Sequence, residues 1–198
     1  MKAIKYMIAI SCSLLVSFFC SCASFRAGNL PPISQWPPAQ VEKEKSISLI
    51  ISGESIVNGK DTEVNSRMLS IWRDQTFAAY RESGLFSFVE VGLAENDLRA
   101  EIKILDQGSY NAGLAFLTGF TLYLIPSKAS DEFIVKTTIK DEEGNTLGSF
   151  EKSENINFWQ QLFLIFALPA NSPISVPKET LYDLNRATII EAHAQGII

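Results

Sequence analysis

The stretch Leu98-Arg99-Ala100-Glu101-Ile102-Lys103-Ile104 alternates apolar and charged side chains without interruption. Successive side chains of a β-strand point to opposite faces, so a period of two predicts a strand with one buried face and one face in water. The buried face needs a second layer to cover it, and amphipathic helices are a common cover. The stretch therefore predicts an α+β domain.

The segments before this stretch predict a buried strand and a long helix. Ile47–Ile51 is apolar and rich in β-branched residues, and we expect this strand to stop at Gly53. The range 61–83 predicts a helix that an Asp-Thr pair caps and that Gly84 ends. Another strand is expected over Ser87–Val91. The helix face that we expect in the core consists of Val64, Met68, Ile71, Trp72 and Ala79.

The segments after this stretch predict three more strands and a final helix. We expect a strand over Thr118–Ile125, and a hairpin of Glu132–Lys140 with Thr146–Ser153 around a Gly-Asn turn. Ser175 can cap the last helix. The residues at helical spacing in it are Leu181, Leu184, Thr188 and Ala192. This order predicts a single two-layer α+β sandwich over residues 46–198, with a small mixed or mostly antiparallel sheet and two main helices.

The N-terminus has the organisation of an export signal. Two lysines precede Tyr6–Phe19, an uncharged and mostly apolar run of fourteen residues. A helix needs about 20 residues to cross ~30 Å of hydrocarbon, so this run is too short for a retained transmembrane anchor. We therefore expect residues 1–21 to be a signal peptide that is cleaved.

The end of this signal, Ser21-Cys22, resembles the lipobox of bacterial lipoproteins, in which a small residue precedes the cysteine that is lipidated. Phe19 and Cys20 stand where Leu and a small residue are usual, as in the relaxed boxes of spirochaetes and some other diderms. The resemblance implies cleavage before Cys22, acylation of Cys22 with chains such as palmitate, and attachment to a lipid bilayer through them. The alternative is an ordinary signal peptide with an incidental cysteine.

The residues after Cys22 predict a location and a tether. Ala23 and Ser24 lack the aspartate that retains enterobacterial lipoproteins in the inner membrane, which favours the periplasmic or outer face of the outer membrane. Residues 22–45 contain four of the eight prolines and end in alternating charges, a composition typical of linkers. We therefore expect lipidated Cys22 and a proline-rich tether in front of the domain.

The domain also resembles a known α/β domain. The residues that carry the resemblance are Arg81–Phe86, Phe88–Val91, Asn96-Asp97 and Asp141–Gly144. They are similar in kind and order to the domain shared by the N-terminal part of TolB, the curli-secretion lipoprotein and the outer-membrane lipoproteins that activate penicillin-binding proteins. The resemblance implies a fold and transfers no functional residue.

Two apolar stretches lack charge. One is 112–125, and the other is 158–168, which contains Trp159, Phe163 and Phe166. The second stretch can be a core element over one end of the sheet, or its aromatic rings can lie in the membrane interface beside the acyl chains. It can also be a contact between subunits. These three interpretations stay open, and Trp159, Phe163 and Phe166 are the candidate interaction surface.

Composition limits the function classes. The net charge is −5 without a basic block, which argues against a nucleic-acid binder. His193 is the only histidine, and cleavage before Cys22 leaves no free thiol, so we expect no catalytic residue, metal site or cofactor. The sequence thus predicts a non-enzymatic binding or assembly accessory protein of the cell envelope, with a protein partner or self-association. The alternative is an apolar-ligand or membrane-surface binder that uses 158–168.

Overall fold

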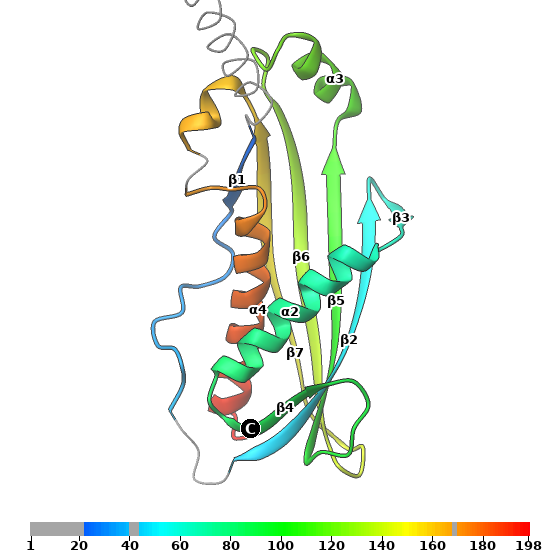
Figure 1. Cartoon of the computed structure of the whole chain (residues 1–198), viewed down its shortest axis with the longest axis vertical. Coiled ribbons are helices and arrows are strands. Elements are labelled where there is room, and N and C mark those ends of the chain that lie inside the picture. The colour runs from blue at the N-terminus through cyan, green and yellow to red at the C-terminus, as the bar shows by residue number, and fades with distance from the viewer. Residues whose placement is uncertain (1–21, 40–43, 168–169) are drawn as a thin grey trace, which may run out of the picture.

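The computed structural model describes residues 22–39, 44–167 and 170–198, which form one open sheet of seven strands and three helices. Figure 1 shows a tall, twisted sheet with two helices on one of its faces. This arrangement confirms the predicted α+β class. The predicted signal peptide, residues 1–21, lies outside the described residues.

The sheet is mixed, as predicted. Its strands in chain order are β1 (Cys22–Arg26), β2 (Lys45–Val57), β3 (Lys60–Thr62), β4 (Phe86–Val91), β5 (Leu98–Tyr110), β6 (Ser127–Asp141) and β7 (Thr146–Gln160). They lie in the order β1-β7-β6-β5-β2-β3, and β4 pairs with β2. β2 runs parallel to β4 and β5, whereas the other pairs are antiparallel.

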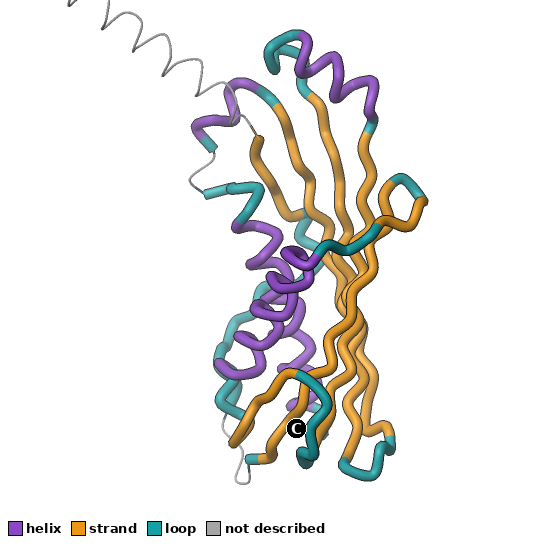
Figure 2. Tube along the Cα trace, turned by 45° about the vertical axis from the view of Figure 1, so that its right-hand side comes forward, coloured by secondary structure: helices purple, strands orange, loops and turns teal. Residues whose placement is uncertain are grey.

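Two long helices form the second layer. α2 (Ser66–Glu82) and α4 (Ser175–Ala194) pack on each other and on one face of the sheet, as Figure 2 shows from the side. A short helix, α3 (Ala112–Phe120), connects β5 to β6, and a 3₁₀ helix, η1 (Leu162–Phe166), follows β7. β5, β6 and β7 extend past the two long helices, so α3 and η1 lie together at one end of the molecule (Figure 1).

The alternating stretch behaves as predicted. Leu98, Ala100, Ile102 and Ile104 are buried under the helices. On the opposite face Glu101 accepts a hydrogen bond from the Lys140 ammonium at 2.7 Å. The predicted hairpin is confirmed as β6 and β7, and both predicted long helices are present.

We expected the first long strand to stop at Gly53, but β2 continues through it to Val57. Gly53 faces the ring of Trp72 on α2. A Cβ there would lie 2.3 Å from that ring, so the glycine lets the helix pack closely on the sheet. The helix also begins later than predicted, at Ser66, because the side chain of Asn65 caps it by accepting from the Met68 amide.

The prediction of a strand over Thr118–Ile125 is wrong. The chain forms α3 there, and the Asn111 side chain caps it by accepting from the Leu114 amide at 2.9 Å. A continuous apolar run fits a strand or a helix equally well, so length and capping decide between them. Leu122 and Tyr123 then take positive φ angles, which end the helix in a tight turn.

The tether expected over 22–45 differs from the structure in the part that is described. Cys22–Arg26 is an edge strand that pairs with β7 over five residues, and Leu30 and Trp36 pack against the core. The buried carboxylate of Glu154 accepts from the amides of Gly28, Asn29 and Leu30 at 2.8–3.2 Å. These contacts hold the described part of the segment against the domain, so it is not a free linker.

Candidate functional site

The end of the sheet that carries α3 and η1 exposes many apolar side chains. Eight of them belong to 116–125 or to η1, and their exposed fractions run from 42% to 85%. We call this group the apolar tip. It consists of Phe116, Leu117, Phe120, Leu122, Leu124, Ile125, Phe163 and Phe166.

Two segments far apart in sequence build the apolar tip. The amide of Leu162 in η1 donates to the carbonyl oxygen of Tyr123, in the turn after α3, at 3.1 Å. Within α3, Phe116 and Phe120 lie one turn apart with stacked rings 6.3 Å between centroids. The backbone bond joins the turn after α3 to the start of η1, and the stacking orders two of the exposed rings within α3.

Neither segment carries charge. The sequence has no Asp, Glu, Lys or Arg between Asp106 and Lys128, and none between Glu154 and Lys178. Soluble monomers rarely expose apolar patches of more than a few hundred Å², and larger ones mark contacts with proteins or membranes. The apolar tip is therefore a candidate interaction surface.

Cys22 lies at the same end of the sheet. It is the first residue of β1 and pairs with Gln160, the last residue of β7, which in turn pairs with Ser127 at the start of β6. Gln160 is two residues from η1, and Ser127 is two residues from Ile125. An acyl group on the Cys22 sulfur would therefore leave the molecule beside the apolar tip.

A tryptophan and a lysine lie one residue further into the sheet. Trp159 pairs with Ala23 on one side and with Lys128 on the other, and the Lys128 ammonium is 5.8 Å from the centre of its indole. Trp159 is partly exposed. Tryptophan is enriched at the headgroup level of membranes, and its ring attracts a nearby cation.

A second candidate is a pocket of about 320 Å³ between the sheet and the two long helices, lined in part by Trp72, Phe133 and Phe158. Asp106 and Asp131 face it from neighbouring strands. Burial, with a smaller contribution from the charge of Asp131, raises the pKa of Asp106 to about 7. Burial also raises the pKa of Asp131. The lining also contains Arg67 and Lys178, and it contains no histidine.

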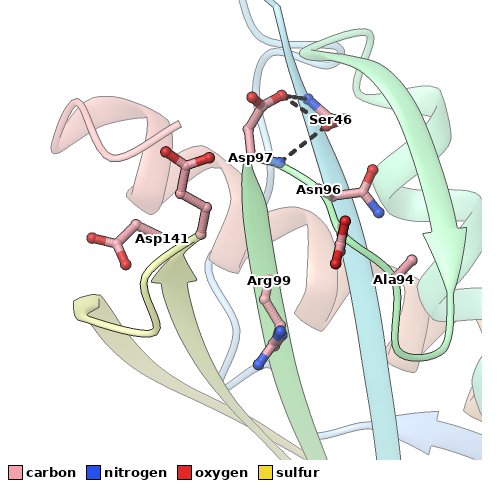
Figure 3. A pocket seen from close by; sticks show the side chains of 8 residues that line it. Ser46, Ala94, Asn96, Asp97, Arg99 and Asp141 are labelled. Carbon is pink, nitrogen blue, oxygen red and sulfur yellow. Dashed lines mark hydrogen bonds between the residues drawn. The ribbon is translucent and has the colours of Figure 1, made fainter.

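A third candidate is an open hollow of about 510 Å³ at the opposite end of the sheet, shown in Figure 3. Two of its acidic residues have structural roles. Asp97 accepts from the amide and the hydroxyl of Ser46, both at 2.7 Å, and so joins β5 to β2. Asp141 closes the hairpin turn, where hydrogen bonds from Asn145 lower its pKa.

The structure brings the predicted site residues together. Cys22, Trp159, Phe163 and Phe166 all lie at the α3 end of the sheet, and the core interpretation of 158–168 does not hold for Phe163 and Phe166, which are exposed. Sequence reasoning missed the contribution of Phe116 and Phe120. The uncharged run after Asp106 was the signal, but a strand was expected in it.

Two more residues named from the sequence, Cys22 and His193, have defined surroundings in the structure. Burial raises the pKa of the Cys22 thiol, which keeps it protonated and a poor nucleophile at neutral pH. His193 lies in the last turn of α4, with its Nδ1 3.2 Å from the carbonyl oxygen of Ile198. Within 22–39, 44–167 and 170–198, no three His, Cys, Asp or Glu residues are grouped to hold a metal ion. No helix in these ranges is long and apolar enough to span a membrane.

Comparison with known proteins gives structural neighbours alone, since no family model and no curated protein matches the sequence. The chain is similar to a minor lipoprotein from Acinetobacter baumannii, with 12% identity over 77% of this chain and 93% of that one and a TM-score of 0.43. It is also similar to a neuraminyllactose-binding hemagglutinin homologue from Helicobacter pylori, with 7% identity, 82% and 87% coverage and a TM-score of 0.41. A third neighbour is a PelC dodecamer from Paraburkholderia phytofirmans, with 10% identity, 83% and 95% coverage and a TM-score of 0.36.

Proposed function

We propose that this protein is a bacterial envelope lipoprotein that is anchored through acylated Cys22 and serves as a non-enzymatic binding or assembly accessory protein at the outer membrane. The observation that carries the proposal is the position of Cys22, which opens β1 at the end of the sheet where the apolar tip lies. The lipobox-like Ser21-Cys22 and the signal-like run before it support the same anchor. The outer membrane is proposed because Ala23 and Ser24 follow the cysteine.

An accessory role fits the chemistry of the described residues. No histidine lines the pocket of the two carboxylates between sheet and helices. In the hollow of Figure 3, Asp97 accepts from Ser46 and Asp141 accepts from Asn145, which are structural hydrogen bonds. The large exposed surface is apolar, and such surfaces serve contact with a membrane or another protein. Binding is therefore the activity that the surface supports.

The test of the anchor is the intact mass of the protein extracted from membranes, with detergent partitioning of the same sample. The proposal predicts a mature chain that begins at Cys22 and carries acyl chains, and that enters the detergent phase. Cys22→Ser should remove the added mass. An unmodified wild-type chain that is released to the aqueous phase would overturn the proposal.

A further inference from the structure

The apolar tip and Cys22 share one end of a sheet that is much longer than its helical layer. The thirteen residues of β5, at ~3.3 Å each, separate this end from the acidic hollow by roughly 40 Å. If one of these ends lies at a membrane, the other end therefore lies far from it.

We propose that the apolar tip inserts into the interface of the bilayer that holds Cys22, so that the protein stands on the membrane on α3 and η1. The inference rests on the proposed function, because acylation of Cys22 decides which bilayer the tip enters. It adds a protein surface to the anchor, and this surface fixes the orientation of the domain.

The first argument is the rigid connection of the anchor to the sheet. Five residue pairs join β1 to β7, and the Ser24 amide also donates to the Asn171 carbonyl oxygen at 2.9 Å. Acyl chains on Cys22 must enter the bilayer where the sheet ends. The adjoining apolar tip then lies within a few residues of the lipid surface.

Second, charge is distributed unevenly between the two ends. The tip segments are uncharged, and Lys128 stands with Trp159 at the boundary. At the far end four carboxylates and one arginine line the hollow, so its charge is net negative (Figure 3); they are Glu95, Asp97, Asp141, Glu142 and Arg99. Insertion of the tip places the lysine near anionic headgroups and keeps the four carboxylates away from them. The opposite orientation would bring carboxylates to the headgroups and leave the apolar side chains in water.

The third argument is the shape of the surface. The most exposed rings, Phe120 and Phe166, project from different segments, and each is more than three-quarters exposed. A protein partner must complement such a surface closely, since interface cores pack as densely as protein interiors. A fluid bilayer accepts separate projecting rings without a matching shape, so it is the occupant that these side chains fit best.

The experiment measures the depth of single fluorescent labels in the lipoprotein reconstituted into vesicles of phosphatidylethanolamine and phosphatidylglycerol. Acylated Cys22 has no thiol to label, and the other two cysteines precede the cleavage site. Phe166→Cys and Phe120→Cys carry a label in each tip segment. Leu93→Cys is the matched control, because Leu93 is a highly exposed apolar residue near the opposite end.

We expect labels at 120 and 166 to be quenched by nitroxide-bearing lipids and protected from iodide, while a label at 93 shows the reverse. Iodide quenching at 120 and 166 equal to that at 93 would overturn the inference. Protection from both quenchers at the tip would also overturn it, because that result indicates a second copy or another protein. The intact mass of each sample reports acylation separately. An acylated protein with a water-exposed tip would therefore refute the insertion and leave the proposed lipid anchor standing.

Discussion

Glu154 is the residue that holds the N-terminal segment on the domain. Its side chain is 1% exposed, and three amides of 28–30 donate to it. Buried carboxylates are stable only when hydrogen bonds of this kind compensate their lost hydration. The position of 28–30, which follows β1 and Cys22, therefore depends in part on one side chain that lies 124–126 residues later in the chain.

We predict that Glu154→Ala lowers the free energy of unfolding by about 3 kcal/mol, because the amides of 28–30 and of Asn155 lose a charged acceptor. Glu154→Gln keeps one acceptor oxygen and should lower it by roughly half as much. Urea unfolding measures both changes. Glu151→Gln on the same strand is the control, since the exposed pair of Glu151 with Lys136 is worth at most about 1 kcal/mol. An effect of Glu154→Ala as small as that of the control would contradict the role of Glu154.

Asp106 makes stability depend on pH. Its pKa is about 7 in the folded protein and near 4 when unfolded, so the unfolded chain ionises first as pH rises. The free energy of unfolding should therefore decrease between about pH 4 and pH 7, by on the order of 4 kcal/mol in total, and be constant above that window. Asp106→Asn should remove most of this decrease.

The measurement is urea unfolding at pH 5 and pH 8 for wild type, Asp106→Asn and the exposed control Asp74→Asn. Wild type and the control should both be less stable at pH 8. A decrease of the same size in Asp106→Asn would show that the buried carboxyl is not the cause.

At the scale of elements, the sequence predicts the strands and helices whose side chains alternate or repeat regularly between a buried and an exposed face. The alternation in Leu98–Ile104, the Gly-Asn turn and the apolar faces of α2 and α4 each predict an element that the structure contains. α3 was missed, because an apolar run without charge has no period that separates helix from strand. β1 was missed, because its partner is β7, some 130 residues later, and its proline-rich continuation has linker composition.

The candidate site was also predictable in its local sequence features and not in its long-range contacts. Cys22, Trp159, Phe163 and Phe166 could each be selected from their local sequence. Their position at one end of the sheet depends on the β1–β7 register and on the bond between Leu162 and Tyr123. Such long-range pairing has no local signature, so the association of 158–168 with α3 and Cys22 required the structure.

The exposed position of η1 predicts that its aromatic rings contribute little to folding. Phe163→Ser with Phe166→Ser should change the free energy of unfolding by less than about 1 kcal/mol, since exposed substitutions usually fall within ±0.5 kcal/mol each. Phe133→Ser, in the buried face of β6, is the matched control and should cost about 3 kcal/mol or more. If the double variant is destabilised as much as Phe133→Ser, the rings of η1 belong to the core and this prediction is wrong.

At the scale of the whole molecule, the account is one of an upright domain with two unlike ends. The apolar tip and Cys22 form one end, and the hollow of Figure 3 with the 141–145 turn forms the other. In the proposed orientation the acidic end lies roughly 40 Å from the membrane.

The most direct test of this account is hydroxyl-radical footprinting of the reconstituted lipoprotein at low protein-to-lipid ratio, read by mass spectrometry at each phenylalanine. Phe88, 57% exposed in β4 near the opposite end, is an internal control in the same sample. The account predicts that Phe88 is oxidised while Phe116, Phe120, Phe163 and Phe166, all more exposed in the isolated chain, are protected. Oxidation of these four at or above the level of Phe88 would contradict it.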